Sequence, residues 1–195
     1  MLRIERCTDT LSRAIAKHTI DIWHSYIKFA DRPSRKLYWL LWECDTLIGV
    51  FGLGSCFHKP KAMRDFMAEH NVAFNEVGNN IVFCLLPNHS KNAGSKALKL
   101  VRNDAKQWWM ERYGDTLRYM QTFIEPPRTG AVYKADNWIE IGITSGAPQH
   151  VRTLYGDEID AHPEAERRVF KSGEIRYLLR EQVKGTQKRI LIRKT

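Results

Sequence analysis

Six apolar residues in succession, Ile81 to Leu86, stand near the middle of the sequence. Such a run without polar alternation is typical of a central strand buried on both faces of a sheet. Pro87 lacks a backbone N–H, so regular strand pairing is expected to end there. Apolar residues then recur at helical spacing from Ala97 to Trp109, which predicts a helix that begins at Ser95. The sequence therefore predicts a buried strand, a short loop and a helix in direct succession.

The loop between this strand and this helix has the features of an anion-binding site. The free N–H groups of a first helical turn point outward, and the helix dipole places partial positive charge there. Gly94 has no Cβ that would keep a ligand from the backbone, and Lys91 adds a full charge. Strand–loop–helix turns occur in every α/β protein, so the spacing alone leaves a purely structural role equally open.

Size and composition indicate one globular domain without a membrane span. The chain has 195 residues, which is enough to bury a sizeable core, and no window approaches about 20 consecutive apolar residues. The first six residues include charges where a signal peptide needs an apolar core. The four cysteines are scattered without a CxxC pair, so neither a disulfide framework nor a zinc site is expected, and a reducing cytoplasm is the simplest location.

The net charge of +9 is high for this length. A strongly basic protein either handles a polyanion such as a nucleic acid or carries its charge as a solvated surface. The composition alone favours nucleic acid as a partner and leaves the second interpretation open.

Periodicity and turn residues predict the remaining elements. A helix capped by Asp9 or Thr10 has Leu11, Ile15 and Ile22 among its apolar residues. An amphipathic segment surrounds Met63 to Ala68. The predicted strands cover 2–7, 37–42, 47–53, 81–86, 117–124 and 138–144, with a short helix over 131–136.

The sequence changes character after Gly146. It becomes polar and charged, with eleven Lys and Arg against seven Asp and Glu from Val151 onward. Two strand-like runs cover 175–179 and 189–193. We expect residues 1–146 to form the core and residues 147–195 to form a basic C-terminal extension packed on it, because about 50 residues bury little core by themselves.

The predicted order of elements resembles the GNAT acyltransferases: strand, helix, hairpin, central strand, glycine-bearing loop, helix, strand, short helix, strand. In that family the loop after the fourth strand binds the pyrophosphate of acetyl-CoA on backbone amides. Its usual signature is a basic residue or Gln, any two residues, Gly, one more, then Gly or Ala. Lys91 to Gly94 fits this signature, but Lys96 occupies the last small position and Ala97 follows one residue late.

This resemblance implies an α/β fold with a mixed central sheet flanked by helices. It also implies acetyl-CoA or a related CoA thioester as cofactor. No metal is predicted, because His58, His70, His89, His150 and His162 lack the spacing of metal ligands. The residues implied to bind the cofactor are Leu86, Lys91, Asn92, Ala93, Gly94, Ser95 and Lys96.

Shorter motifs are similar to those of Mom-like DNA-modification proteins of phages, which have a GNAT-like fold. They are Asn92 before Ser95, Gly130 with Tyr133, and the run from Asn137 to Gly142, with weaker support from the run that begins at His24. Members of that group modify adenine in DNA at N6, giving a carbamoylmethyl-type adduct that blocks restriction enzymes. The similarity covers residues 15–145 and implies a transferase that acts on DNA in the cytoplasm of a phage-infected bacterium.

Modifying an adenine amino group requires a proton acceptor, a group that stabilises charge, and access to a base extruded from the duplex. Candidate catalytic residues are His24, Glu125 and Tyr133; a tyrosine at the last position protonates the departing thiolate of CoA in many GNAT enzymes. Each also has a structural interpretation, as a helix-end histidine, a loop cap and a core aromatic respectively. Candidate DNA-binding residues are Arg32, Arg35, Lys36 and Arg128.

Three functions therefore remain open. The first is a Mom-like DNA-modification enzyme that uses a CoA-type donor. The second is an ordinary GNAT N-acetyltransferase of an amine on a small molecule or a protein. The third is a non-catalytic DNA-binding relative that has lost the donor site, an interpretation that the departure at Lys96 supports.

Overall fold

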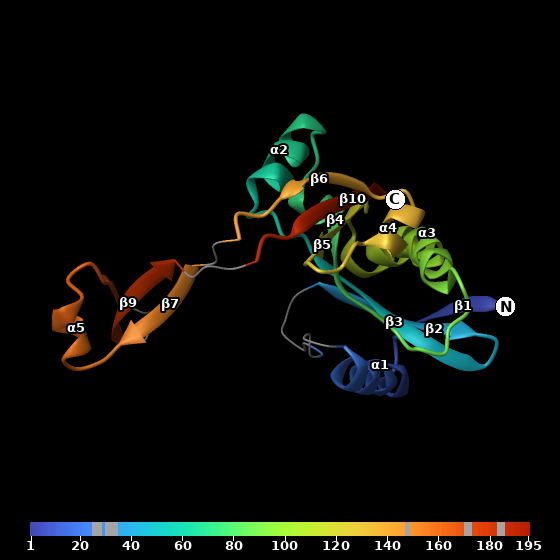
Figure 1. Cartoon of the computed structure of the whole chain (residues 1–195), viewed down its shortest axis with the longest axis horizontal. Helices are drawn as coiled ribbons and strands as arrows, with labels where there is room; N and C mark the ends of the chain where they lie inside the picture. Colours follow the sequence, from blue (N-terminus) through green and yellow to red (C-terminus); the bar gives the residue numbers. More distant parts are fainter. Residues whose placement is uncertain (25–28, 30–34, 147–148, 170–172, 183–185) are drawn as a thin grey trace. The chain divides into compact units, whose positions relative to one another are not determined.

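The computed structural model describes residues 1–24, 29, 35–146, 149–169, 173–182 and 186–195. It divides into two compact units (Figure 1). The core unit comprises residues 1–144 and 188–195, and the second unit, which we call the arm, comprises residues 145–187.

A seven-stranded mixed sheet forms the centre of the core unit. Its strand order is β1-β2-β3-β4-β5-β10-β6, and every neighbouring pair is antiparallel except β4 and β5, which are parallel. The strands are β1 (Leu2–Arg6), β2 (Lys36–Glu43), β3 (Thr46–Ser55), β4 (Val77–Leu85), β5 (Tyr119–Ile124), β6 (Ile139–Ile143) and β10 (Arg189–Lys194). The predicted central strand and hairpin are confirmed.

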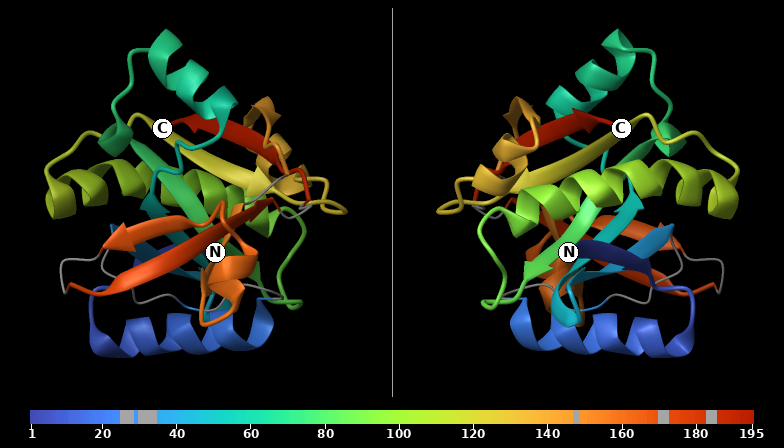
Figure 2. Two further views of the ribbon diagram at one scale, coloured as in Figure 1. Left: turned by 90° about the vertical axis from the view of Figure 1, so that its left-hand side faces the viewer. Right: turned by 90° about the vertical axis from the view of Figure 1, so that its right-hand side faces the viewer.

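Helices cover both faces of this sheet. The long helix α3 (Ala93–Tyr113), yellow-green in Figure 2, packs on one face with α4 (Ala131–Ala135), over a core that includes Trp109, Met120 and Tyr133. Side chains alternate along a strand, so Tyr119, next to Met120, points to the opposite face. That face carries α1 (Thr10–Trp23) and α2 (Lys61–Glu69), the latter followed by a 3-10 turn at Phe74–Glu76.

Helix α1 begins as predicted, but it buries a different stripe from its most apolar one. Asp9 is the N-cap, and its carboxylate accepts hydrogen bonds from the backbone of Leu11 and Ser12. The buried side chains are Ser12, Ala16, Thr19 and Ile20, whereas Leu11 and Ile22 are exposed. Small side chains on the buried stripe let the helix lie close to the sheet.

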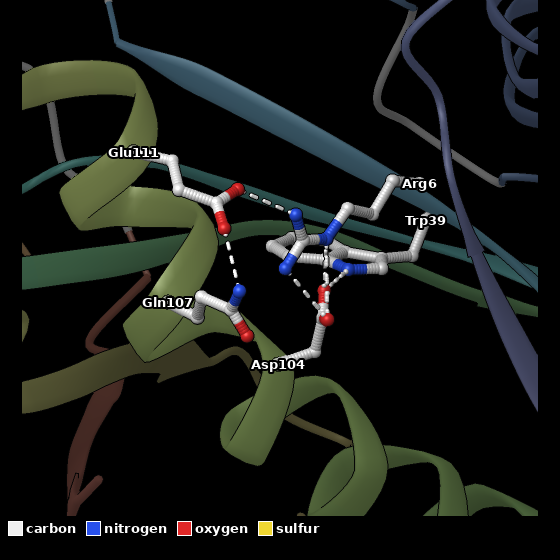
Figure 3. A network of polar contacts seen from close by, with 5 residues as sticks. All are labelled: Arg6, Trp39, Asp104, Gln107 and Glu111. Carbon is white, nitrogen blue, oxygen red and sulfur yellow. Dashed lines mark hydrogen bonds and ion pairs between the residues drawn. The ribbon is translucent and has the colours of Figure 1, made fainter.

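A polar network joins the N-terminal strands to α3 (Figure 3). Asp104 on α3 accepts hydrogen bonds from Arg6 Nε (2.9 Å), from Arg6 Nη2 (2.9 Å) and from Trp39 Nε1 (2.7 Å). Glu111, about two turns further along α3, accepts from Arg6 Nη1 (2.7 Å). A bidentate guanidinium–carboxylate pair of this kind fixes both the distance and the angle between the elements that carry it.

Strand β10 lies between β5 and β6, within the core sheet. It pairs with β5 from Arg189 opposite Ile124 onward, and with β6 along its other edge. The structure therefore divides the chain differently from the expected boundary at residue 146: the run predicted over 189–193 completes the core. Thr144 donates to Lys188 O (2.9 Å), and Lys188 N donates to Thr144 Oγ1 (3.0 Å), so the arm leaves and returns at one point of the sheet.

The arm is a separate three-stranded antiparallel sheet with the order β7-β9-β8. Leu154, Leu178 and Leu179 are its buried side chains among the described residues. Seven Lys and Arg balance seven Asp and Glu between 145 and 187, so the whole positive excess of the chain lies in the core unit. The arm's elements are β7 (Gln149–Leu154), α5 (Glu158–Ala161), β8 (Glu166–Val169) and β9 (Ile175–Gln182).

Candidate functional site

Strands β4 and β5 diverge in the middle of the core sheet. Their parallel pairing covers three positions and ends at Asn79 opposite Gln121. Beyond that point the facing edges of the two described strands have no ladder hydrogen bonds to each other, while β3 and β10 pair with their outer edges. The divergence therefore leaves backbone donors and acceptors on two facing edges.

A cavity of about 610 Å³ occupies this divergence. Its floor and walls come from β4, β5 and the segment that leads into α4. No Asp or Glu is among the residues that line it, within the part of the chain that the structure describes. The lining residues are His24, Asn79–Phe83, Leu85, Thr122–Ile124, Arg128–Tyr133 and Lys188.

A β-bulge in β4 places Asn80 in the wall of the cavity. Gly52 on β3 lies opposite Val82, and Leu53 lies opposite Asn80, so Ile81 is the extra residue. The side-chain amide of Asn80 donates to Val82 O (2.7 Å) and to Gly52 O (3.0 Å). Its Oδ1 accepts a hydrogen bond from Tyr133 Oη at 2.6 Å. A buried side chain thus satisfies the carbonyls around the bulge and holds the tyrosine hydroxyl.

Tyr133 reaches the cavity from α4 and is 8% exposed. Gly130 is the N-cap of α4 with φ +70°, a left-handed conformation that glycine adopts without a steric cost. The ring packs edge-on against Phe83 and Trp138, whose centroids are 6.0 and 5.1 Å away. The structure therefore places Tyr133 at the cavity as the resemblance implied, but packed and hydrogen-bonded.

The N-terminus of α3 packs directly against the wall of the cavity. A Cβ on Gly94 would lie 2.7 Å from Val132 Cγ2 and 2.9 Å from Leu85 Cδ1, and both of those residues line the cavity. The expectation that Gly94 lets a ligand approach the backbone is corrected here: the missing Cβ makes room for two protein side chains. Gly94 nevertheless allows the first turn of α3 to pack against the cavity wall.

Several amides of the predicted cofactor loop are used by the protein itself. Leu86 N donates to Ile48 O (2.9 Å), Ala93 N to Ser90 O (3.2 Å) and Lys96 N to Asn92 O (3.2 Å). Leu86 therefore continues the pairing with β3 and cannot offer its N–H to a ligand. None of the described residues accepts a hydrogen bond from the backbone N–H of Gly94 or of Ser95.

Three further features define this loop. Asn92 is the N-cap of α3 in a left-handed conformation (φ 65°), and its carbonyl accepts from Ser95 Oγ (3.2 Å). Lys91 and Lys96 are exposed. Glu43 accepts from Ser90 N (2.9 Å) and Ser90 Oγ (2.5 Å), and these bonds lower the pKa of Glu43 below its usual value. The protein's own carboxylate thus caps the start of the loop. The amides of Gly94 and Ser95 in the first turn of α3 have Lys96 in the same turn and Lys91 just before the helix.

His24 lies at the C-cap of α1 and lines the cavity. Desolvation by burial lowers its pKa below the usual value, and the positive charge of Arg128 lowers it further. The imidazole is therefore neutral at pH 7, the form that can accept a proton.

Glu125 directly follows Ile124, which lines the cavity, but Glu125 itself does not line it. Its carboxylate lies 2.9 Å from Lys188 Nζ, which does line it.

The predicted DNA-binding residues that the structure describes have different surroundings. Arg35 pairs with Asp115 and lies over the ring of Tyr113, with 5.0 Å between Cζ and the ring centroid. Lys36 begins β2, and its backbone N–H donates to Tyr113 Oη (2.7 Å). Arg128 is exposed at the cavity, and Arg32 lies outside the described residues.

Sequence reasoning missed three polar residues at the site. Each of them lines the cavity because of strand pairing that the sequence does not reveal. Asn80 lies beside the β-bulge, Lys188 directly precedes β10, and Asn79 lies where β4 and β5 part. Asn79 Oδ1 and the buried Gln121 Nε2, on the last paired rung, have no hydrogen-bond partner among the described residues. The polar pair Asn79-Asn80 within an otherwise apolar strand was the one available signal.

Comparison with solved structures identifies the fold as that of the GNAT acyltransferases, as the sequence implied. A Bacillus subtilis acetyltransferase, solved in complex with CoA, superposes with a TM-score of 0.55 at 12% identity over 100% of this chain and 99% of that one. An N-acetyltransferase from Staphylococcus aureus gives a TM-score of 0.52 at 13% identity over 100% and 97%. No family model and no curated protein matches the sequence.

Two further findings hold for the residues that the structure describes. None of the helices is long and apolar enough to cross a membrane. No group of three or more His, Cys, Asp or Glu side chains in the same ranges is placed to hold a metal ion.

Proposed function

We propose that the protein is a CoA-dependent N-acyltransferase whose donor binds between β4 and β5. The observation that carries this proposal is the cavity at their divergence, with the first turn of α3 packed against one wall and the hydroxyl of Tyr133 in another. When bound, CoA supplies an acyl group activated as a thioester. The two facing strand edges offer backbone groups to a chain of amides such as the pantetheine arm of CoA.

The residues at the loop fit an anionic group of the size of a diphosphate. The N–H groups of Gly94 and Ser95 point out of the positive end of a 21-residue helix. Lys91 and Lys96 add full charges beside them. Leu86 and Ala93 shape the loop rather than donate to the ligand, because their N–H groups donate to Ile48 O and Ser90 O. Asn92 shapes it through its carbonyl, which accepts from Ser95 Oγ and Lys96 N.

Proton transfers are assigned to the cavity residues. His24, neutral at pH 7, accepts a proton from the attacking amine. Tyr133 donates a proton to the thiolate that leaves. Glu125 holds Lys188 at the rim of the cavity through their ion pair, and it is the alternative proton acceptor to His24.

An amine on a small molecule or a protein is the simplest acceptor, because it requires neither a DNA-binding surface nor a base extruded from the duplex. A second acceptor, adenine N6 in DNA as in the Mom-like proteins, is favoured by one observation, the concentration of the whole +9 charge in the core unit. Modification of phage DNA in this way would protect it from restriction. Arg128 is the candidate phosphate contact nearest the cavity.

The first test is CoA binding by isothermal titration calorimetry. Lys96→Glu should weaken binding about 10-fold or more, because it reverses a charge at the first turn of α3. Lys106→Glu makes the same change about 15 Å further along the helix and should have much less effect. Equal effects of the two variants, or no binding by the unaltered protein, would count against the donor site.

The second test separates the acceptors. Acetyl-CoA turnover is measured with a panel of amines, and nucleosides from DNA treated with the protein and CoA thioesters are analysed by mass spectrometry. Amine turnover without DNA supports the first acceptor, and a modified adenosine that is absent with Tyr133→Phe supports the second. DNA binding that falls steeply with salt, without CoA affinity, would leave only a DNA-binding protein.

A further inference from the structure

The orientation of the Asn80 amide follows from its neighbours. Its nitrogen lies 3.0 Å from Gly52 O and 2.7 Å from Val82 O, and both of these carbonyls only accept hydrogen bonds. The NH₂ group must therefore face the bulge, and Oδ1 must face Tyr133 Oη at 2.6 Å. Because an amide oxygen has no proton to give, the tyrosine hydroxyl donates in this bond.

This bond fixes where the hydroxyl proton points. In the resting site the O–H of Tyr133 is directed at Asn80, and breaking a buried hydrogen bond is unfavourable. The position of the ring has separate support, from Phe83, from Trp138 and from the hydrogen bonds of α4. The contribution that is specific to Asn80 is the direction of the proton and the position of the oxygen.

We infer that Asn80 is the positioning residue for Tyr133. It holds the tyrosine hydroxyl while the donor is an intact thioester and releases it to the thiolate when the thioester breaks. This inference rests on the proposed acyl transfer. An uncharged thioester sulfur is a weak acceptor and does not draw the hydroxyl away from Asn80. A thiolate accepts a charge-assisted hydrogen bond, which is roughly twice as strong as a neutral one, and so competes with the amide oxygen.

The proton balance of the step is complete. The Tyr133 Oη–H bond breaks and an S–H bond forms on the leaving group. The nitrogen of the acceptor has given its proton to His24, which passes it to solvent, and a proton from solvent restores the phenol. The hydroxyl then returns to Asn80 Oδ1. An interaction that is made with the leaving thiolate and not with the ground state raises kcat rather than substrate affinity.

The experiment measures how the rate depends on the acidity of the leaving thiol. Acetyl thioesters of thiols that range from alkyl to nitrophenyl are compared, and the logarithm of kcat/KM is plotted against the pKa of the thiol. The slope does not depend on how much of a variant is folded. Asn103→Ser is the matched control, since it changes the same residue type at an exposed position of α3 that does not line the cavity.

The unaltered protein and Asn103→Ser should give a shallow slope, because a proton reaches the leaving group. Tyr133→Phe, Asn80→Ser and the double variant should share one steeper slope. With acetyl-CoA, Asn80→Ser should lower kcat about 10-fold or more, an effect that does not add to that of Tyr133→Phe. A donor with nitrophenyl thiol should recover most of this loss.

Two results would overturn the inference while leaving the proposed function in place. One is a shallow slope for Asn80→Ser beside a steep one for Tyr133→Phe, which would make Asn80 structural only. The other is a shallow slope for both, which would remove Tyr133 as the acid. Absence of turnover by the unaltered protein with every thioester and amine would overturn the proposed function, and the inference with it.

Discussion

Gly94 and Val132 are in such close contact that no side chain fits between them. A Cβ on residue 94 would come within 2.7 Å of Val132 Cγ2, well inside van der Waals distance. The first turn of α3 and the start of α4 are thereby held together at the cavity wall. The absence of a side chain at residue 94 is therefore required by packing between two helices, whatever binds at the loop.

Gly94→Ala should destabilise the protein by about 1–3 kcal/mol, because the added methyl group overpacks a buried contact. The added methyl group would meet Val132 Cγ2 and Leu85 Cδ1, and Val132→Ala removes the first of these atoms. The double variant should therefore be more stable than the sum of the two single effects predicts. Urea unfolding measures each free energy. Ser95→Ala is the control and should stay within about 0.5 kcal/mol. Strict additivity would contradict the contact.

The arm should be removable without loss of the core. Thr144 and Lys188 lie opposite each other and exchange hydrogen bonds at the point where the arm leaves the sheet. Replacing residues 145–187 by Asn-Gly would join β6 to β10 through a two-residue hairpin turn. The melting temperature of the core should change by no more than a few degrees. A shortened chain that is unfolded by circular dichroism would refute this division.

Truncation before residue 188 is the matched comparison for that deletion. It removes fewer residues from the chain, yet it takes away β10, which includes the buried Ile190, Leu191 and Ile192. We expect the truncated chain to be insoluble or unfolded, since β5 and β6 would both lose their shared neighbour.

Asp104→Ala should cost about 1–3 kcal/mol of unfolding free energy, because Arg6 and Trp39 both lose an acceptor. The pair is partly exposed, so the effect should stay below that of a fully buried ion pair. Lys17→Ala breaks the exposed Lys17–Asp21 pair and should change stability by less than about 0.5 kcal/mol. Thermal and urea unfolding of the two variants compare these effects, and equal losses would contradict the network's structural role.

The stability of the protein should depend on the ionisation of His24 in one direction. Its pKa is lower in the folded state, first because of desolvation and then because of Arg128. Below about pH 6.5 the unfolded chain therefore binds more protons than the folded protein does. The neutral His24 supports the folded state above this pH, and that support is lost as the pH falls through the pKa of the folded state. Between pH 8 and 5 the melting temperature should fall less in His24→Gln than in the unaltered protein.

Histidine NMR tests the cause of that shift. The Cε1 proton that disappears in His24→Gln should titrate below pH 6.5 in the unaltered protein. In Arg128→Gln the same resonance should titrate at a higher pH, because the second cause is removed while desolvation remains. An unchanged titration would show that the charge of Arg128 does not act on His24.

Local sequence patterns predicted the elements around the cavity, and long-range pairing decided its chemistry. The apolar run in β4, the proline after it and the helical spacing of α3 each depend on neighbouring residues. The environment of Asn80 depends instead on a bulge in the pairing of β4 with β3. Its place in the cavity wall cannot be predicted until the register of that pairing is known.

The same distinction explains the basic residues. Arg35 was predicted to contact DNA because it lies in a predicted loop, and its pairing with Asp115, 80 positions away, could not be predicted from neighbouring residues. Lys188 was assigned to an extension because of its sequence position, and the pairing of β10 brings it to the cavity. Positions of this kind follow from the packing of segments that are far apart in the sequence.

The place of β10 in the sheet also has a consequence for the synthesis of the protein. Among the strands that the structure describes, β6 pairs with β10 alone, and more than 40 residues separate the two in the chain. At about 5–20 residues per second, a ribosome leaves β6 unpaired for several seconds, with the partly buried Ile141 among its side chains. During that interval the nascent chain presents an apolar strand edge that a chaperone is suited to cover, and any slow codons within the arm would prolong it.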